Sequence, residues 1–354
     1  MLSLQGLRQN PGPAKAALAK RGNEQYPAAV DQVLAVDEER REAIAEVEAL
    51  KARRNEVSRE IGAIKRDGGD AEAQILEMRT VGEQIAELDA VVSKADSKIR
   101  EILLGIPNLP FSEVPPGDEE DNVLIRTWGE PPAFSFEGKP HWELGEALGI
   151  LDLPRGAKVS GSGFPLLRGK GARLQRGLID YMLDLHTREH GYEDLRIPYL
   201  VTEESMVGTG QLPKFAEESY LSDRDGLWLI PTAEVPVTNL YRDELQTGDD
   251  LPKRFPAYSP CFRRDAGAAG KDTRGLLRVH QFDKVEVVRY ETPEGSREAL
   301  EELTGEAETI LQRLGLAYRV VLLAAGDLGF SSAMTYDLEV WAPGVEKWLE
   351  VSSC

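Results

Sequence analysis

Two long runs of helical periodicity, one on each side of a glycine pair, constrain the fold of this chain most strongly. From about Val30 to Lys65 the sequence has no proline, and apolar residues recur at helical spacing. After Gly68-Gly69 a second run repeats apolar residues at alternating steps of three and four, which is typical of a coiled-coil seam. The seam residues are Ile44, Val47, Leu50, Val57, Ile61 and Ile64 in the first run and Ile85, Leu88, Val92, Ala95, Ile99 and Ile102 in the second. We predict an antiparallel two-helix arm that projects on the order of 50 Å, with Asp70 as N-cap of the returning helix.

Charge is distributed unevenly along the first run of the arm. Residues 31–50 carry seven acidic and two basic side chains, whereas residues 51–66 carry six basic side chains against Glu56 and Glu60. A rigid arm with a basic end suits contact with a folded RNA, which proteins recognise largely by shape and backbone charge. The RNA-binding candidates are Lys51, Arg53, Arg54 and Arg59. An assembly device or an ordinary solvated helix face would show the same periodicity.

A proline-rich stretch from Ile106 to Asp121 ends the helical pattern and predicts a domain boundary. We place an arm domain at residues 1–110 and a second domain at residues 111–354. In the second, short β-branched runs such as 285–288 and 318–323 alternate with helical stretches such as 174–190 and 296–314. The glycine patterns of Rossmann and P-loop nucleotide sites are absent from the sequence. The chain is therefore predicted to have an α+β fold without either of those nucleotide domains.

The composition restricts the partners and the compartment. The 354 residues are 41% hydrophobic and carry a net charge of -19, so a nucleic acid must bind through a local basic patch. No apolar run approaches the roughly 20 residues of a membrane span, and we expect neither a membrane nor DNA as a partner. The two cysteines, Cys261 and Cys354, lie far apart, which favours the cytoplasm. We interpret both cysteines and the four scattered histidines, His141, His186, His190 and His280, as structural.

The stretch from Cys261 to Glu286 combines the residue types that bind a nucleotide. A β-type segment ends at Phe262-Arg263, a glycine-containing loop follows, and a second segment contains Arg278, Phe282 and Glu286. Guanidinium groups can hold phosphate oxygens with two hydrogen bonds each, and an aromatic ring can stack on a base. The loop also contains Lys271 and Arg274, which suit approach to a polyanion. An ordinary charged surface hairpin is the alternative interpretation.

This stretch resembles the second motif of class II aminoacyl-tRNA synthetases, in the form found in bacterial seryl-tRNA synthetases. The resemblance extends over essentially the whole chain, and residues 177–201 resemble the first class II motif, which builds the dimer interface in that family. The other matching stretches are residues 1–22, the arm, Lys158–Phe164, Gly208–Phe215, Thr232–Pro236 and Glu350–Cys354. The resemblance implies a homodimer with an antiparallel sheet flanked by helices. It also implies activation of L-serine with ATP and transfer to tRNA(Ser), with tRNA(Sec) as a further candidate.

The resemblance also assigns roles to residues of this sequence. Arg263 is expected to hold the α-phosphate and Arg278 the terminal phosphates, while Phe282 stacks on adenine. Glu350 and Ser353 are expected to bind ATP through Mg²⁺, and Glu286 is the candidate acceptor for the serine hydroxyl. The expected catalytic residues are Arg263, Arg278 and Glu286. The expected serine site comprises Thr232, Ala233, Glu234, Arg263 and Glu286. The expected ATP site comprises Arg263, Arg264, Asp265, Arg278, Val279, Phe282, Glu350, Val351, Ser352 and Ser353.

The sequence departs from the family pattern in two places. Asp265 stands where the second motif usually has a glutamate. We expect Asp265 to take part in adenine recognition all the same. The third class II motif is missing, so we interpret the chain as a fragment and expect it to have little or no activation activity alone. A synthetase-like binding protein and a ligase that loads carrier proteins are the alternatives. Arg263, Arg278, Glu286 and Glu350 oppose the first, and the long arm opposes the second.

Overall fold

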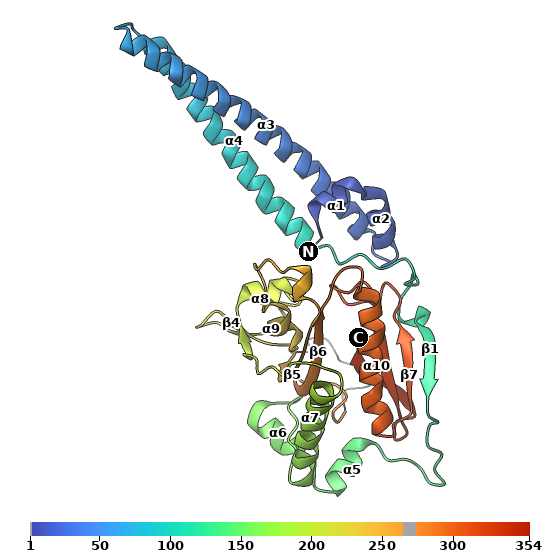
Figure 1. The fold of residues 1–354 in the computed structure, drawn as a ribbon. Coiled ribbons are helices and arrows are strands. Elements are labelled where there is room, and N and C mark those ends of the chain that lie inside the picture. Colours follow the sequence, from blue (N-terminus) through green and yellow to red (C-terminus); the bar gives the residue numbers. More distant parts are fainter. Residues whose placement is uncertain (1, 265–273) are drawn as a thin grey trace. The chain divides into compact units, whose positions relative to one another are not determined.

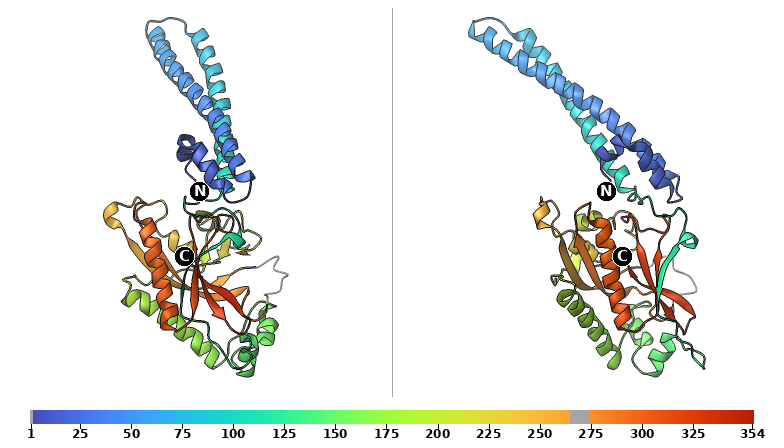
Figure 2. Two further views of the ribbon diagram at one scale, coloured as in Figure 1. Left: turned by 90° about the vertical axis from the view of Figure 1, so that its right-hand side faces the viewer. Right: turned by 45° about the vertical axis from the view of Figure 1, so that its right-hand side comes forward.

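The computed structural model describes residues 2–264 and 274–354, which form two compact units (Figures 1 and 2). The first unit spans Met1–Pro116 and the second spans Gly117–Cys354. No helix among the described residues is both long and apolar enough to cross a membrane.

The first unit is helical and is dominated by an antiparallel hairpin (Figure 1). Its helices are α1 (Leu4–Gln9), α2 (Pro11–Ala19), α3 (Gln25–Arg66) and α4 (Glu72–Leu104). The predicted arm is confirmed, although α3 has 42 residues and begins before Val30. Pro27 lies in the first turn of α3, where a missing backbone N–H costs no helical hydrogen bond. The helix therefore begins before this proline and not after it.

The reversal between α3 and α4 differs in one detail from the prediction. Ala71, not Asp70, occupies the N-cap position of α4. The Asp70 carboxylate still accepts a hydrogen bond from the Glu72 backbone N–H at 2.9 Å, so it satisfies a donor of the first turn from one position earlier. Gly68 has a φ of +75°, which a side chain would oppose, and this explains the glycine at the turn.

The seam of the arm is narrow and apolar, as predicted. Val47, Val81 and Ile85 form a buried cluster with Leu50 and Leu88 packed against it. At the base of the arm, a second cluster joins the arm helices to the two short helices, which gives this end a broader core. Its buried members are Leu7, Ala14, Leu18, Val30, Val33, Ile99, Leu103 and Ile106.

The second unit mixes helices with antiparallel strands, and the predicted α+β class is confirmed. Its helical elements are η1 (Glu119–Asp121), α5 (His141–Ala147), α6 (Leu153–Ser160), α7 (Lys170–Arg188), α8 (Glu203–Gly208), α9 (Glu234–Thr238), η2 (Gly248–Asp250) and α10 (Ser296–Arg313). Its strands are β1 (Val123–Trp128), β2 (Leu200–Val201), β3 (Tyr220–Ser222), β4 (Leu227–Leu229), β5 (Lys253–Phe262), β6 (Gln281–Tyr290), β7 (Tyr318–Leu322), β8 (Tyr336–Ala342) and β9 (Lys347–Ser353).

The described strands pair in three antiparallel sheets, in the orders β1-β7-β8-β9, β2-β4-β3 and β5-β6. The predicted antiparallel pairing is confirmed, and it is divided among these three sheets. Besides β6, β5 meets an isolated parallel bridge between Leu195 and Ala257. Helix α10 covers one face of the four-stranded sheet, where Leu311 packs with Tyr318, Val320 and Leu338.

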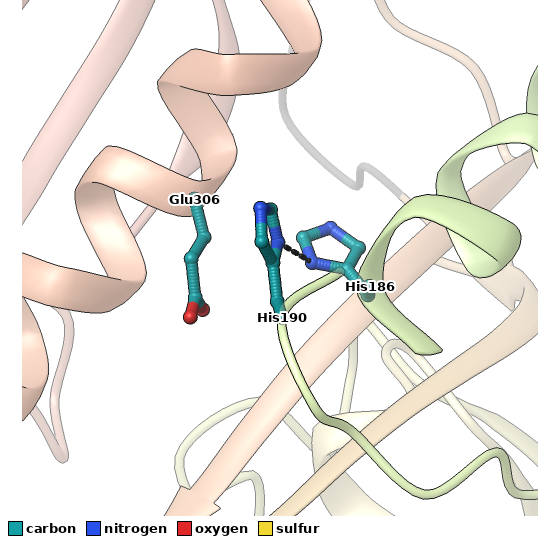
Figure 3. A group of neighbouring side chains, drawn as sticks. All are labelled: His186, His190 and Glu306. Carbon is teal, nitrogen blue, oxygen red and sulfur yellow. Dashed lines mark hydrogen bonds between the residues drawn. The ribbon is translucent and has the colours of Figure 1, made fainter. Parts of the chain in front are cut away.

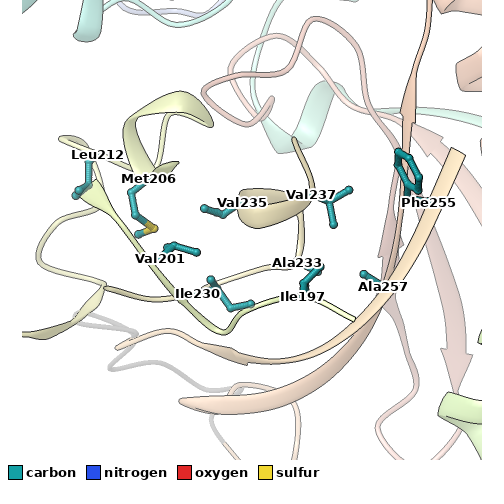
Figure 4. Packing of buried hydrophobic residues seen from close by; sticks show 10 residues of the cluster. All are labelled: Ile197, Val201, Met206, Leu212, Ile230, Ala233, Val235, Val237, Phe255 and Ala257. Carbon is teal, nitrogen blue, oxygen red and sulfur yellow. The ribbon is translucent and has the colours of Figure 1, made fainter. Parts of the chain in front are cut away.

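The core beside the β5–β6 hairpin supports the segment that carries Thr232. Ala233, Val235 and Val237, at the start of and within α9, are fully buried in this cluster together with Ile230 and Ala257 (Figure 4). Because the backbone on both sides of Thr232 is anchored in close-packed apolar contacts, the threonine hydroxyl has a fixed position.

Candidate active site

The β5–β6 hairpin places the predicted nucleotide residues at one end of a regular ladder. Cys261 lies opposite Phe282, and the ladder extends past Phe262 because the Arg263 backbone N–H donates to the His280 carbonyl at 3.0 Å. Side chains alternate between the two faces of a strand, so Phe282, Lys284 and Glu286 share one face of β6. The pairing thus aligns an aromatic, a cationic and an acidic side chain along that face.

Arg263 lies beside Phe282, as the sequence predicted. Its Nε donates a hydrogen bond to the Pro231 carbonyl at 3.3 Å, and the guanidinium lies 5.2 Å from the centroid of the Phe282 ring. The bond to Pro231 also brings Arg263 next to the segment that begins the Thr232 site. A guanidinium held by its Nε keeps its two terminal nitrogens available for a bidentate anion contact.

Thr232, Lys284 and Glu286 form a closed polar triangle. The Thr232 hydroxyl donates to the Glu286 carboxylate at 2.7 Å, and Lys284 Nζ lies 2.8 Å from the same hydroxyl oxygen. Lys284 Nζ also forms an ion pair of 2.5 Å with Glu286, whose side chain is 19% exposed. The ammonium group therefore neutralises an acid that is mostly removed from water.

Glu234 adds a second carboxylate to this triangle. Its backbone N–H donates to the Thr232 hydroxyl at 3.2 Å. Burial raises the pKa of the Glu234 carboxyl, and the nearby Glu286 raises it further, while Lys284 and Arg263 act in the opposite direction. Two carboxylates and one ammonium thus form an acidic cluster that suits a ligand with an ammonium group.

Strand β9 brings Glu350 and Ser353 to a common face. Glu350 pairs with Glu339 of β8, and Ser353 pairs with Asp337. Glu339 and Asp337 are two residues apart and so share a face of β8. Glu350 and Ser353 are three apart, and a register shift in β9 accommodates the additional residue. Val351 is exposed at this irregularity, and Ser352 pairs with the buried Leu338.

The electrostatic environment connects Glu350 to the hairpin. Partial removal from water raises the pKa of the Glu350 carboxyl, although the residue is exposed at the surface. The positive charges of Arg263 and Lys284 lower this pKa. Burial also raises the pKa of Asp337 to about 7, and its Oδ1 is buried without a hydrogen-bond partner among the described residues. Arg263 after β5, Lys284 of β6 and Glu350 of β9 therefore share one electrostatic site.

The remaining predicted residues lie around this site in different ways. Arg278 is exposed in the turn before β6, and Val279 after it is buried. Arg264 lies over the Tyr220 ring, 5.4 Å from its centroid. Ala233 is fully buried in the core.

The central part of the second motif lies partly outside the described residues. Asp265 and Lys271 are among the residues whose structure is not described, and Arg274 is exposed at the first described position after them. The roles expected for Asp265 and Lys271 stay predictions.

Sequence reasoning missed Lys284 and treated two histidines as unrelated. Lys284 could have been found from the alternation between Phe282 and Glu286 on one strand. His186 and His190 were described as scattered, but their Nδ1 atoms lie 3.0 Å apart. Their spacing of four residues, one helical turn, was the available signal.

The basic candidates on the arm differ in their contacts. Lys51 pairs with Asp89 at 3.3 Å, and Arg53 pairs with Glu56 at 3.1 Å. Arg54 and Arg59 are exposed, and no hydrogen bond or ion pair is found for them within the described part of the chain. These two guanidinium groups are the ones most available to a partner.

Two family models match this chain. Residues 1–110 match the seryl-tRNA synthetase N-terminal domain, and residues 216–354 match the tRNA synthetase class II core domain (G, H, P, S and T).

Individual relatives match over most of the chain. A serine–tRNA ligase of Gemmatimonas aurantiaca is 56% identical over 92% of this chain and 76% of its own length. A serine–tRNA ligase of Geobacillus thermodenitrificans is 54% identical over 100% of this chain and 83% of its own length.

A solved structure agrees with the fold. The seryl-tRNA synthetase of Pyrococcus horikoshii, solved as a complex with ATP, is similar with a TM-score of 0.94 at 37% identity. The similarity covers 100% of this chain and 83% of that one.

Proposed function

The chain belongs to the seryl-tRNA synthetase family, and on this premise we propose that it activates L-serine with ATP and transfers the seryl group to tRNA(Ser). The observation that carries the proposal is the position of Arg263 and Phe282 next to the triangle of Thr232, Lys284 and Glu286. A nucleotide held by the first pair lies beside an amino acid held by the second group. tRNA(Sec) is a further candidate acceptor.

ATP binds across the end of the β5–β6 hairpin in this proposal. Arg263 holds the α-phosphate, Arg278 holds the terminal phosphates, and Phe282 stacks on adenine. Arg263 lies 5.2 Å from the Phe282 ring, so the two groups reach adjacent parts of one nucleotide. Arg264, Asp265 and the backbone at Val279 complete the adenine side, and Val351 and Ser352 form the backbone edge of the site.

Glu350 and Ser353 fit a bound Mg²⁺. The register shift in β9 places a carboxylate and a hydroxyl oxygen on one face, and Mg²⁺ prefers hard oxygen ligands. These two oxygens would hold a Mg²⁺ ion, which would supply charge neutralisation for the phosphates of ATP. The positive charge of Arg263 lowers the pKa of Glu350 and so favours the ionised form of this carboxyl, which is the form that binds a metal.

Serine binds at the acidic cluster beside the nucleotide. Glu234 receives the ammonium group, with Thr232 and Ala233 beside it, and Glu286 accepts the hydrogen bond of the serine hydroxyl. Alanine would leave the Glu286 carboxylate without that partner, which is a large penalty in a mostly buried site. Threonine is excluded by lack of room in the proposed pocket.

The chemistry needs positioning and charge neutralisation rather than a nucleophile on the enzyme. The serine carboxylate attacks the α-phosphorus, and pyrophosphate leaves. Arg263 stabilises the charge that develops on the α-phosphate, while Arg278 holds the leaving group. In the second step a terminal ribose hydroxyl of the tRNA attacks the carbonyl carbon of the adenylate, and AMP leaves.

The arm and a second copy of the chain complete the proposed assembly. Lys51, Arg53, Arg54 and Arg59 on the arm contact the tRNA backbone, and Lys271 and Arg274 guide its acceptor end. Residues 177–201 contribute to a homodimer interface. The proposed domains are residues 1–110 for tRNA binding and residues 111–354 for catalysis.

Pyrophosphate exchange tests the proposal directly. The natural full-length protein is assayed with ATP and each of the amino acids in turn, and exchange should depend on serine. Arg263→Ala should lower the serine kcat/KM by roughly 100-fold or more, because it removes a donor to the reacting phosphate. Arg224→Ala is the matched control, since Arg224 is exposed in the turn between β3 and β4. Exchange that depends on another amino acid would overturn the assignment.

A further inference from the structure

A second polar cluster lies where the end of α7 meets α10 and shares no residue with the proposed active site (Figure 3). His186 is in the last turn of α7, and His190 follows one turn later in the chain. Glu306 comes from α10 and lies beside the His190 ring. One nitrogen from each histidine and one oxygen from Glu306 all lie within 4.8 Å of one another.

The spacing of the two imidazole nitrogens is close to that of two ligands on one small cation. The two Nδ1 atoms are 3.0 Å apart. Tetrahedral zinc binds imidazole nitrogen at about 2.0–2.1 Å, which separates two such nitrogens by roughly 3.3–3.4 Å. A small rotation of the rings therefore lets the two Nδ1 atoms bind the same ion. Two histidines and one carboxylate, with water in the fourth position, form a known zinc ligand set.

The two histidine rings face each other through their Nδ1 atoms, and His186 is buried at 4% exposure. Without a cation, one ring must donate its Nδ1 proton to the other. With a cation, both rings carry their proton on Nε2 and present both Nδ1 lone pairs, so no net proton is released.

The surroundings orient the carboxylate and limit the opposing charge. The Tyr192 hydroxyl donates to Glu306 Oε2 at 2.5 Å, which leaves Oε1 as a ligand and supplies an outer hydrogen bond of the kind that metal sites use. The nearby cations Arg254 and Arg289 both pair with Glu302, at 3.4 and 2.7 Å. Glu302 thus engages both of these cations.

We propose that His186, His190 and Glu306 bind one Zn²⁺ ion that ties the end of α7 to α10. The ion replaces a shared imidazole proton with a bond between two elements that lie far apart in the sequence. His190 and Glu306 are half-buried, which gives the ion a route of entry. The role is a structural brace, independent of serine activation.

Zinc content after equilibrium dialysis tests the site. The full chain is treated with a chelator, dialysed against ZnCl₂ and washed by gel filtration, and one zinc per chain should remain. His190→Gln and Glu306→Gln should each weaken zinc binding by about 10-fold or more. Glu189→Gln should not, because Glu189 is a neighbouring exposed carboxylate that pairs with Arg313 instead. Circular dichroism checks that each variant is folded.

Spectroscopy separates this site from binding by the cysteines. Co²⁺ in place of zinc should show a tetrahedral spectrum without thiolate charge transfer, and imidazole ¹⁵N signals of two histidines should change to the Nε2-protonated form. A chain that retains no zinc would overturn the proposal. Zinc that persists unchanged in both folded variants, or a thiolate band from Cys261 or Cys354, would overturn it equally.

Discussion

Glu234 is the residue whose protonation should control serine binding. Its raised pKa means that the carboxylate gains a proton at a higher pH than an ordinary glutamate. We expect the KM for serine to rise as the pH falls through that range, because a neutral acid no longer attracts the ammonium group. Glu234→Gln should lower kcat/KM roughly 10- to 100-fold and remove this pH dependence, measured by exchange in the natural full-length protein.

Lys284 offers a check on the same pH profile. Lys284 lowers the pKa values of both Glu234 and Glu350. Lys284→Met should therefore move the acidic loss of serine binding to higher pH. Lys253→Met is the matched control, because Lys253 lies at the other end of the same hairpin, over the Tyr241 ring. An identical profile in the Lys284 variant and the wild type would contradict the charge relation described above.

Some residue-level features could be read from the sequence and others could not. The pairing of Arg263 with Phe282 follows from two adjacent strand segments and was predicted as a shared site. The hydrogen bond from Arg263 to Pro231 depends on a segment about 30 residues away in the sequence, which no local pattern reveals. The same holds for Glu306, which approaches His186 from a separate helix.

At the scale of elements, the arm allows a test of RNA contact by charge reversal. Arg54→Glu combined with Arg59→Glu should reduce the magnitude of the salt slope of tRNA binding by about 1–2, since each lost phosphate contact contributes roughly 0.7–0.9. Serine-dependent exchange should stay unchanged. Filter binding over a range of salt concentrations, together with exchange kinetics, measures both effects.

A matched pair on the other half of the arm controls for net charge. Lys94→Glu combined with Arg100→Glu changes the charge equally at exposed positions nearer the base of α4. This control should bind tRNA much as the wild type does. If both double variants lose affinity equally, the basic half of the arm has no special role.

The core beside the active-site segment allows a stability test. Ile230 is fully buried, so Ile230→Ala should lower the free energy of unfolding by about 2–5 kcal/mol through lost burial and a cavity. Leu221→Ala, at a position 45% exposed on the neighbouring β3, should cost much less. Urea denaturation of the two variants measures the difference, and equal losses would show that the Ile230 cluster does not support this segment.

Elements with strong local periodicity were the most predictable. The arm helices, α7 and α10 could be recognised because their apolar spacing is local. The division of the strands into three sheets could not, because it depends on pairing between segments that lie far apart in the sequence, such as β1 with β7. The start of α3 was placed late because its first turn tolerates a proline.

At the scale of the whole molecule, the net charge of -19 means that RNA contact must be local, as the arm proposal requires. The homodimer is also a whole-molecule proposal, and a groove between α7 and the end of α10 supports it. The groove has a volume of about 580 Å³ and is lined by Lys170, Arg173, Leu174, Gly177, Leu178, Tyr181, Arg313 and Leu314. Leu174 is 60% exposed there.

A charge in this groove should prevent dimerisation. Leu174→Glu should give a monomer in sedimentation velocity, because an unpaired carboxylate would be buried in the interface. Leu245→Glu, at a position 95% exposed outside the groove, should leave the dimer intact. A Leu174 variant that remains fully dimeric would place the interface elsewhere.

A crystal structure with a non-hydrolysable seryl-adenylate analogue tests the central claim most directly. The account predicts the phosphate substitute on Arg263, adenine against the Phe282 ring, the serine ammonium near Glu234 and the serine hydroxyl on Glu286. An analogue bound with its adenine away from Phe282 and its seryl group away from Thr232 and Glu286 would contradict the account.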